Sequence, residues 1–530
     1  QAASYAVVSD CSAGCHSFLV FFFLVCSKLK TMEDMFGDLG IVDAQGWRVS
    51  EFSAGGVNSQ KARLALEERY WPITEITERF NRQSVSYQLS KRDCLHKWLK
   101  YKEGFSAELV SALLRDFRLQ KGDLVVDPFM GSGTTALVSM FNGYNSLGFD
   151  ILPMSEIAIR AKTAIYVYDV LELKELLKEV VNLHVPEEYA GRTPEIGITK
   201  DGYPSETSRD LAYYKEHFLN SRYSETTKML LELCTLNALE RISCSAKDGQ
   251  YLRWDYRCPK ITAASEARLR QGKKPFAVKL DKGSLPSLKE VLLEELSGVL
   301  RDIEYLNNTP IGFDTQCNFI EGSALFELPK LADGTVSAVI SSPPYCNRYD
   351  YTRTYALELA YLGLSEADVR ALRQDLLSCT VENKSKIEQL RDYYHQIGQE
   401  DHYDRTMKIV DGNAALQEIN NALKSRNENG EINNKGVLKM VDGYFTELTF
   451  LFSELYRVCK TGAYVAFVND NVRYAGEVIP VDFLTTNLAE QIGFTPVKIY
   501  TLKQQKGNSS QQMKKYGRVA LRKSITIWQK

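Results

Sequence analysis

The sequence lacks the residue patterns that hold metal ions and structural disulfides. Its 11 cysteines are odd in number and scattered, and no C-x-x-C pair occurs among them. The six histidines show no metal-ligand spacing either. We therefore expect no metal site and no disulfide framework, and a reducing cytoplasm is the simplest location for the chain.

An excess of charge of one sign is also missing. Lys and Arg total 65 and Asp and Glu total 67, so the formal net charge is −2. Hydrophobic residues make up 44% of the 530 residues, which is enough to bury a large core and argues against a disordered or fibrous protein. An anionic partner would have to be bound by local basic patches.

Hydrophobic runs are short. The stretch FLVFFFLVC, residues 18–26, is too short to cross a bilayer as a helix. No Lys or Arg precedes it, so the basic segment of a signal peptide is missing as well. We expect residues 1–34 to be a non-native or disordered extension before a start at Met32 or Met35. The alternative is a weak membrane anchor, and otherwise we predict no membrane partner.

Seven short apolar runs have strand character, and helical patterns separate several of them. Strands that alternate with helices build sheets covered by helices, so the pattern predicts an α/β fold. The predicted strands are Leu124–Val126, Ser146–Asp150, Asn318–Glu321, Ser337–Ser341, Tyr464–Val468, Thr495–Tyr500 and Ser524–Trp528.

Two long interruptions between these strands are predicted to be mainly helical insertions. A further helical pattern runs from Lys61 to Phe117, before the first strand. Beyond residue 34 we expect five segments: 35–164 with N-terminal helices and two strands, 165–314 as the first insertion, 315–363 with two strands, 364–440 as the second insertion, and 441–530 with the last three strands.

A glycine turn follows the first predicted strand. Gly131 and Gly133, within the run 127–135 (DPFMGSGTT), let the backbone turn sharply and let a ligand approach the main chain. Asp150 ends the next strand, where such folds place a carboxylate on ribose hydroxyls. No G-K-[S/T] follows, which excludes a phosphate-binding P-loop. The turn fits an adenosine-like ligand, nicotinamide dinucleotides included, because residues 131–136 also match the relaxed G-x-G-x-x-G/A pattern.

The fourth predicted strand leads into the tetrapeptide Ser342-Pro343-Pro344-Tyr345. Two consecutive prolines fix the backbone. A serine hydroxyl and a proline carbonyl can accept both hydrogens of an exocyclic amine, and the tyrosine ring can stack on the base that carries the amine. Methyl transfer to such a nitrogen needs this orientation, because its lone pair is delocalised into the ring. If the motif stood alone, a rigid strand-to-loop turn with a packed tyrosine would be the favoured interpretation.

Together, the glycine turn and the tetrapeptide resemble the S-adenosylmethionine-dependent amino-methyltransferases of DNA, over a span from about His96 to Lys530. The resemblance implies a Rossmann-like sheet of seven strands, with S-adenosylmethionine lying across the carboxyl ends of the first two. It implies that Asp127 faces the methionine amine of this cofactor. It assigns the catalytic site to Ser342, Pro343, Pro344 and Tyr345.

Other segments are similar to further elements of the same family. Residues 97–106 resemble the element that folds over the methionine end of the cofactor. Glu321-Gly-Ser-Ala324 stands where the family usually has Gly-Asp-Ala, so Ser323 is a departure. The residues that the resemblance assigns to the cofactor are Phe105, Asp127, Pro128, Phe129, Gly131, Gly133, Thr134, Thr135, Asp150 and Ser323.

The first residue of the tetrapeptide separates subclasses of the family. Ser-Pro-Pro-Tyr is similar to the enzymes that methylate cytosine at N4, whereas Asp or Asn in that position is usual for adenine N6. Some adenine enzymes also carry Ser, and Ser341 replaces a threonine that is common before the motif, so N6-adenine stays the alternative. No Pro-Cys occurs in the chain, which argues against the cysteine nucleophile of carbon-5 methylation.

Several other functions stay open. Structured RNA and protein glutamine are alternative acceptors, because both chemistries use similar Pro-Pro-Tyr sites, although no RNA-binding appendage is recognisable. A nicotinamide-dependent oxidoreductase would leave the tetrapeptide unexplained, and intact motifs disfavour a catalytically silent DNA-binding relative. We expect site-specific modification of double-stranded DNA with a flipped target base, in restriction–modification or a related defence, with a cognate restriction endonuclease as a further candidate partner.

Three basic segments are candidates for contact with that DNA. Residues 346–353 follow the tetrapeptide, which a target base reaches only after leaving the double helix. Residues 241–279 interleave cations with aromatic rings and make the first insertion the candidate target-recognition region. After Glu490 no acidic residue occurs, and residues 503–516 form a polar loop between the last two strands. The predicted DNA contacts are Arg348, Tyr349, Arg353, Arg253, Trp254, Arg257, Lys503, Lys506, Lys514 and Lys515.

Overall fold

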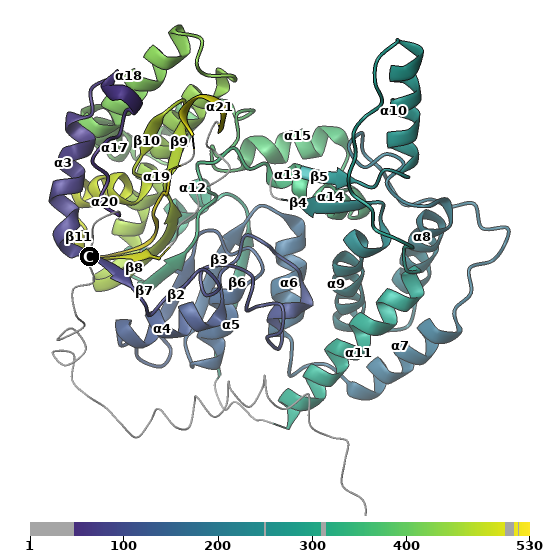
Figure 1. Ribbon diagram of the computed structural model, residues 1–530. Coiled ribbons are helices and arrows are strands. Elements are labelled where there is room, and N and C mark those ends of the chain that lie inside the picture. Colours follow the sequence, from purple (N-terminus) through teal and green to yellow (C-terminus); the bar gives the residue numbers. More distant parts are fainter. Residues whose placement is uncertain (1–46, 249–250, 309–313, 504–512, 518) are drawn as a thin grey trace, which may run out of the picture.

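The structure is a computed structural model that describes residues 47–248, 251–308, 314–503, 513–517 and 519–530 (Figure 1). The extension that we expect at residues 1–34 lies outside these residues. Within the described residues, every helix is too short or too polar to cross a membrane.

A sheet of eight strands forms the centre of the molecule, in the order β1-β11-β12-β8-β7-β2-β3-β6. The α/β class and the Rossmann-like sheet are confirmed, and each of the seven predicted strands is present, but the predicted strand number is wrong. The bounds are β1 Thr74–Thr77, β2 Leu124–Asp127, β3 Asn145–Asp150, β6 Cys317–Glu321, β7 Val336–Ser341, β8 Cys459–Asp470, β11 Thr495–Leu502 and β12 Lys523–Gln529.

The additional strand, β1, lies where the sequence predicts helix. The segment from Lys61 to Phe117 holds α3 (Lys61–Tyr70) and α4 (Ala107–Phe117), with β1 and irregular structure between them. β1 pairs in parallel with β11 at one end of the sheet. Four residues are too few to show a period-two pattern, so pairing with β11 decides their conformation.

The directions of the strands determine which side chains meet. All neighbouring strands of the central sheet are parallel except for β12, which runs antiparallel to both β8 and β11. The carboxyl ends of the parallel strands therefore share one edge of the sheet, which we call the carboxyl edge. Because β12 is reversed, its first residue, Lys523, lies at this edge and pairs in register with Asp470, the last residue of β8.

Helices cover both faces of the sheet. α4 and α5 (Thr134–Phe141) pack on one face, where Leu113 and Val125 belong to one buried cluster. α19 (Gly436–Val458) and α20 (Val481–Ile492) pack on the other, where the ring centroids of Phe452 and Trp528 lie 4.9 Å apart. Burial on both faces explains why β7 is apolar along most of its length.

The first insertion packs against the sheet domain through α9, which contacts α6 (Pro153–Thr163). Above this bundle, α10 projects away from the other helices (Figure 1), and none of its side chains is buried. The elements of the insertion are α7 Val170–Asn182, α8 Ser205–Leu219, α9 Glu225–Ile242, β4 Ser245–Asp248, β5 Tyr251–Trp254, α10 Pro259–Arg270 and α11 Leu288–Asn307.

The second insertion is helical, and α17 and α18 pack on α19. Its helices are α15 Glu366–Asp375, α16 Ile387–Gln396, α17 Glu400–Gly412 and α18 Ala414–Glu428. The remaining elements are α12 Ala324–Glu327, α13 Tyr351–Thr354, α14 Ala356–Tyr361, β9 Val472–Tyr474, β10 Glu477–Ile479 and α21 Met513–Tyr516, with short 3₁₀ turns at Ala54–Gly56, Trp71–Ile73, His96–Trp98 and Leu328–Lys330.

Arg522 lies directly before β12 and ties three parts of the chain together. Its buried guanidinium donates to Glu67 on α3, to Asp482 on α20 at 2.9 Å and to the carbonyl of Trp47 at 3.1 Å. The side chains of Glu67 and Asp482 are buried as well. Loss of Arg522 would therefore leave two carboxylates that water cannot solvate.

Arg522→Met keeps the length of the side chain and removes its charge. We expect the free energy of unfolding, measured by urea denaturation, to fall by about 3–5 kcal/mol, because Glu67 and Asp482 lose their buried partner. Arg69→Met is the matched control, since Arg69 pairs with Glu490 at the surface, where such pairs contribute about 0–1 kcal/mol. Equal losses in both variants would contradict a buried role for Arg522.

Candidate active site

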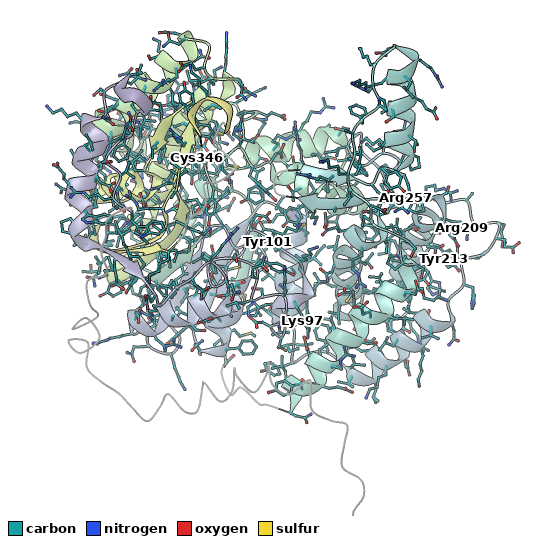
Figure 2. All side chains as sticks on the ribbon, viewed as in Figure 1. Lys97, Tyr101, Arg209, Tyr213, Arg257 and Cys346 are labelled. Carbon is teal, nitrogen blue, oxygen red and sulfur yellow. The ribbon has the colours of Figure 1, made fainter. Side chains whose placement is uncertain are left out.

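A pocket opens at the carboxyl edge, where β2, β3 and β7 end. Its empty volume, including the mouth, is about 710 Å³, within the size range of small-molecule sites. Tyr101, which lines it, lies between the sheet and the first insertion (Figure 2). The predicted cofactor residues that line the pocket are Phe105, Asp127, Pro128, Phe129, Gly131, Thr134, Asp150 and Ser323.

The glycine turn forms the floor of this pocket and needs glycine at both positions. Gly131 and Gly133 have φ angles of +53° and +84°. A Cβ atom on Gly131 would lie 2.8 Å from the Tyr101 ring, and one on Gly133 would lie 2.7 Å from Ile159 on α6. Gly131 therefore allows Tyr101 to close over the turn, whereas Gly133 allows α6 to pack behind it.

Asp127 is buried under the turn and holds it in place. Its carboxylate accepts hydrogen bonds from Ser341 Oγ at 2.6 Å, Thr135 Oγ1 at 2.8 Å and the Phe129 amide at 3.0 Å. Burial raises the pKa of Asp127 to about 6, although these three hydrogen bonds act in the opposite direction. A carboxylate has about four acceptor sites, so one remains for a cationic donor in the pocket.

Asp150 ends β3 and joins the turn to the next loop. Its Oδ2 accepts from the Gly131 amide at 2.8 Å, and its Oδ1 accepts from the Leu152 amide at 2.9 Å. Burial raises the pKa of this carboxyl. Acceptor sites remain on both oxygens, which suits the two neighbouring hydroxyls of a ribose.

The wall of the pocket combines apolar side chains with one further carboxylate side chain. Leu376 and Leu377, from the second insertion, line it together with Phe129, and Glu103 lines it from the segment before α4. Apolar walls suit an adenine ring, and the free acceptor sites of Asp127 and Asp150 suit an ammonium group and a ribose. The residues present therefore fit S-adenosylmethionine.

Two predicted cofactor residues stand behind the pocket rather than in its lining. Gly133 packs on α6, as described above, and Thr135 is buried and donates to Asp127. Sequence reasoning missed the contribution of the second insertion, because residues 375–377 carry no motif.

Tyrosines from the segment after the tetrapeptide hold the pocket wall. Tyr349 and Tyr355 both donate to the carboxylate of Glu103, and the Tyr101 and Tyr355 rings stack with centroids 5.3 Å apart. Tyr349, a predicted DNA contact, is buried and directs its hydroxyl to this wall. The three tyrosines at residues 349, 351 and 355 were the available signal for this packing.

The tetrapeptide lies at the pocket and at its rim. Ser342 and Pro344 line the pocket, whereas Pro343 is buried. Ser342 Oγ lies 3.3 Å from the Tyr345 hydroxyl and 3.5 Å from the Val468 carbonyl on β8. Ser342 and Tyr345 are both half-buried, so each keeps an accessible surface.

The predicted DNA-contacting arginines differ in their partners. Arg348 has a φ of +66°, and among the described residues its side chain has no hydrogen bond or ion pair. Arg353 pairs with Asp350 and Glu382, and Arg257 pairs with Asp255 and Asp281. Arg253 lies on β5, and Trp254, also on β5, lies under the ammonium of Lys260 at 4.9 Å from its ring centroid.

The predicted lysine contacts near the C-terminus are only partly described. Lys503 pairs with Glu78, and Lys515, on α21, pairs with Glu431. Lys506 and the side chain of Lys514 lie outside the described residues. No group of three or more His, Cys, Asp or Glu side chains suited to a metal ion occurs in the described part of the chain.

Cofactor affinity should depend on pH through Asp127. Below its pKa of about 6 the carboxyl is protonated and no longer attracts an ammonium group. Affinity for S-adenosylhomocysteine, measured by calorimetry, should then fall by up to about tenfold per pH unit. Asp127→Asn should bind about 10- to 100-fold more weakly at pH 8 and show a flatter pH profile.

Asp150 titrates in the same pocket, so its contribution needs a separate control. 5′-Methylthioadenosine keeps the ribose but lacks the amino acid, and its pH profile reports Asp150 without Asp127. Unchanged affinity of Asp127→Asn for S-adenosylhomocysteine at pH 8 would contradict the contact between Asp127 and the amine.

The chain is similar to known DNA methyltransferases. Residues 41–158 match the family model N6_N4_Mtase, described as DNA methylase. The chain is 55% identical to the Type II methyltransferase M.BsoBI of Geobacillus stearothermophilus over 484 residues. These aligned residues make up 91% of this chain and 95% of the relative. It is 38% identical to the Type II methyltransferase M.AvaI of Nostoc sp., over 88% of this chain and 92% of the relative. The chain therefore belongs to the Type II DNA methyltransferases of the N4/N6 amino-methyltransferase family, which use S-adenosylmethionine as methyl donor.

Proposed function

We propose that the protein methylates N4 of cytosine in double-stranded DNA at a specific recognition site. Ser342 carries this proposal, because a serine opens the tetrapeptide at the rim of the cofactor pocket. The family includes N4-cytosine and N6-adenine enzymes, so the subclass rests on this residue. The resemblance of Ser-Pro-Pro-Tyr to the N4-cytosine enzymes favours cytosine.

The residues of the chain bring the amine and the methyl donor together. S-adenosylmethionine supplies an electrophilic methyl group on a sulfonium sulfur. Asp127 and Asp150 hold its amine and ribose, while Ser342 Oγ and the Pro343 carbonyl accept the hydrogens of the target amine and turn its lone pair towards the pocket. Tyr345 stacks on the base. The target nitrogen would bond to the methyl carbon as the bond from that carbon to sulfur breaks, and the nitrogen would then lose its proton to solvent.

We propose that DNA approaches the carboxyl edge beside the tetrapeptide. β11 ends and β12 begins at this edge, and Lys523, the first residue of β12, lies beside Tyr345. Arg348, three residues after Tyr345, has no hydrogen bond or ion pair among the described residues, although its guanidinium lies 5.8 Å from the ring centroid of Tyr474, and we propose it for contact with a phosphate. The exposed α10 of the first insertion carries Arg268 and Arg270 in its last turn and supports a role in target recognition.

Methylation of this kind belongs to restriction–modification, as the Type II relatives indicate. We propose that a cognate endonuclease recognises the same DNA sequence and that the methyl group blocks its cleavage. A cytoplasmic location, predicted from the scattered cysteines, would give the enzyme access to the genome.

The nature of the methylated nucleoside tests the proposed function. The purified protein, duplex DNA and S-adenosylmethionine should yield N4-methylcytosine, detected by mass spectrometry after digestion to nucleosides. N6-methyladenine as the product would overturn the assignment to cytosine. Methylation of RNA or of a protein glutamine, with DNA left unmodified, would overturn the DNA substrate.

Variants of the tetrapeptide serve as controls for the same reaction. Ser342→Ala and Tyr345→Ala should abolish methyl transfer, because both side chains are assigned to the base. Their affinity for S-adenosylhomocysteine should stay nearly unchanged, since Asp127 and Asp150 are intact. Wild-type turnover in either variant would make the tetrapeptide a structural turn.

The basic segment between β11 and β12 should contribute a charge-dependent part of DNA binding. Replacing Lys503, Lys506, Lys514 and Lys515 by Gln should weaken binding similarly for every DNA sequence. The slope of log affinity against log salt should flatten by up to roughly 0.9 for each phosphate that a lysine no longer neutralises. Lys174→Gln is the matched control, because Lys174 pairs with Glu304 within the first insertion. An unchanged slope would mean that these lysines are only solvated or paired with Glu78 and Glu431.

A further inference from the structure

Lys523 and Asp470 lie beside the tetrapeptide, and the reaction described above uses neither. Lys523 opens β12 and Asp470 ends β8, and the antiparallel register places them opposite each other. Both side chains are largely buried, at 12% and 19% exposure. Removing both charges of such a pair from water costs free energy of desolvation. The position of this pair next to the proposed catalytic tetrapeptide therefore suggests a function.

The contacts of Lys523 converge on Tyr345. Its Nζ donates to the Tyr345 hydroxyl at 2.9 Å, lies 4.6 Å from the ring centroid of Tyr345 and lies 3.6 Å from Asp470 Oδ1. Burial alone would lower the pKa of Lys523, but Asp470 and Tyr345 together hold this pKa above its usual range. The ammonium therefore stays charged and acts as a donor to the tyrosine oxygen.

This donor also affects the neighbouring serine. Ser342 Oγ is 3.3 Å from the Tyr345 hydroxyl, longer than the usual 2.7–2.8 Å between two hydroxyl oxygens. A tyrosine held by Lys523 keeps this distance, so acceptor capacity on Ser342 remains for the target amine. A tyrosine released from Lys523 would be free to turn and to engage Ser342 more closely.

We propose that Lys523 is a positioning residue for the target base, which fixes the Tyr345 ring through its hydroxyl while Asp470 holds the ammonium in place. The positioning role of Lys523 rests on the proposed function, because that function includes the stacking of Tyr345 on the target base. The antiparallel direction of β12 is the structural cause, since a parallel strand would place its first residue at the opposite edge of the sheet.

A double-mutant cycle separates this role from a purely structural one. In single-turnover assays with saturating cofactor, Lys523→Met should slow methyl transfer about 10- to 100-fold, as expected for a hydrogen bond to a charged group. Its affinities for S-adenosylhomocysteine and for DNA should stay within about twofold. In a Tyr345→Phe background, which already lacks the hydroxyl, Lys523→Met should produce no further loss. Lys523→Arg, which keeps a charged donor, should recover part of the rate.

The chain offers a matched control on the neighbouring strand. Lys498 on β11 also pairs with an acid, Glu75, and lies 5.8 Å from the ring centroid of Tyr500, but away from the tetrapeptide. Lys498→Met should leave the single-turnover rate unchanged. An equal loss from Lys498→Met, or full additivity of Lys523→Met and Tyr345→Phe, would overturn the proposal.

Folding defects and errors in the proposed function remain distinguishable. If thermal unfolding shows that Lys523→Met is not folded, Asp470→Asn tests the same anchor with the same shape, and its loss of rate should also disappear in the Tyr345→Phe background. If the product is N6-methyladenine, the cycle still reports whether Lys523 acts through Tyr345. Wild-type turnover in Tyr345→Ala would instead overturn the stacking role and this proposal together.

Discussion

Parallel pairing of the strands is the constraint on which the site depends. Because β2, β3 and β7 run in the same direction, Asp127, Asp150 and Ser341 end at one edge of the sheet. The hydrogen bond from Ser341 to Asp127 then joins the segment that leads into the tetrapeptide to the cofactor turn. A cofactor held by the two acids and a base held by Ser342 must therefore lie in neighbouring positions.

β12, which runs opposite to the other strands of the central sheet, places its first residue at the carboxyl edge. β12 begins at the carboxyl edge and brings Lys523 to Tyr345 and Asp470. Because of the same reversal, β11 ends and β12 begins at this edge. Arg522, one residue earlier, donates to buried carboxylates on α3 and α20.

The parts of the site that were predictable are those in which chemistry requires a fixed local spacing. The glycine turn and Ser342-Pro-Pro-Tyr345 are continuous in the chain, so their residues could be named without a fold. The contributions of β1, Leu376 and Lys523 could not be predicted from the sequence, because they depend on pairing or packing with distant segments. Tyr349 shows the limit for single residues: an aromatic next to cations suggested contact with DNA, but Glu103 of the pocket wall accepts its hydrogen bond.

We propose that cofactor and target base meet at the carboxyl edge between Asp127 and Ser342. A crystal structure of the complete chain with S-adenosylhomocysteine and duplex DNA containing the recognition site tests it most directly. We expect the ligand amine at Asp127, its ribose at Asp150, and a flipped cytosine stacked on Tyr345 with its amine at Ser342. A target base left in the double helix, or one placed away from Tyr345, would contradict it.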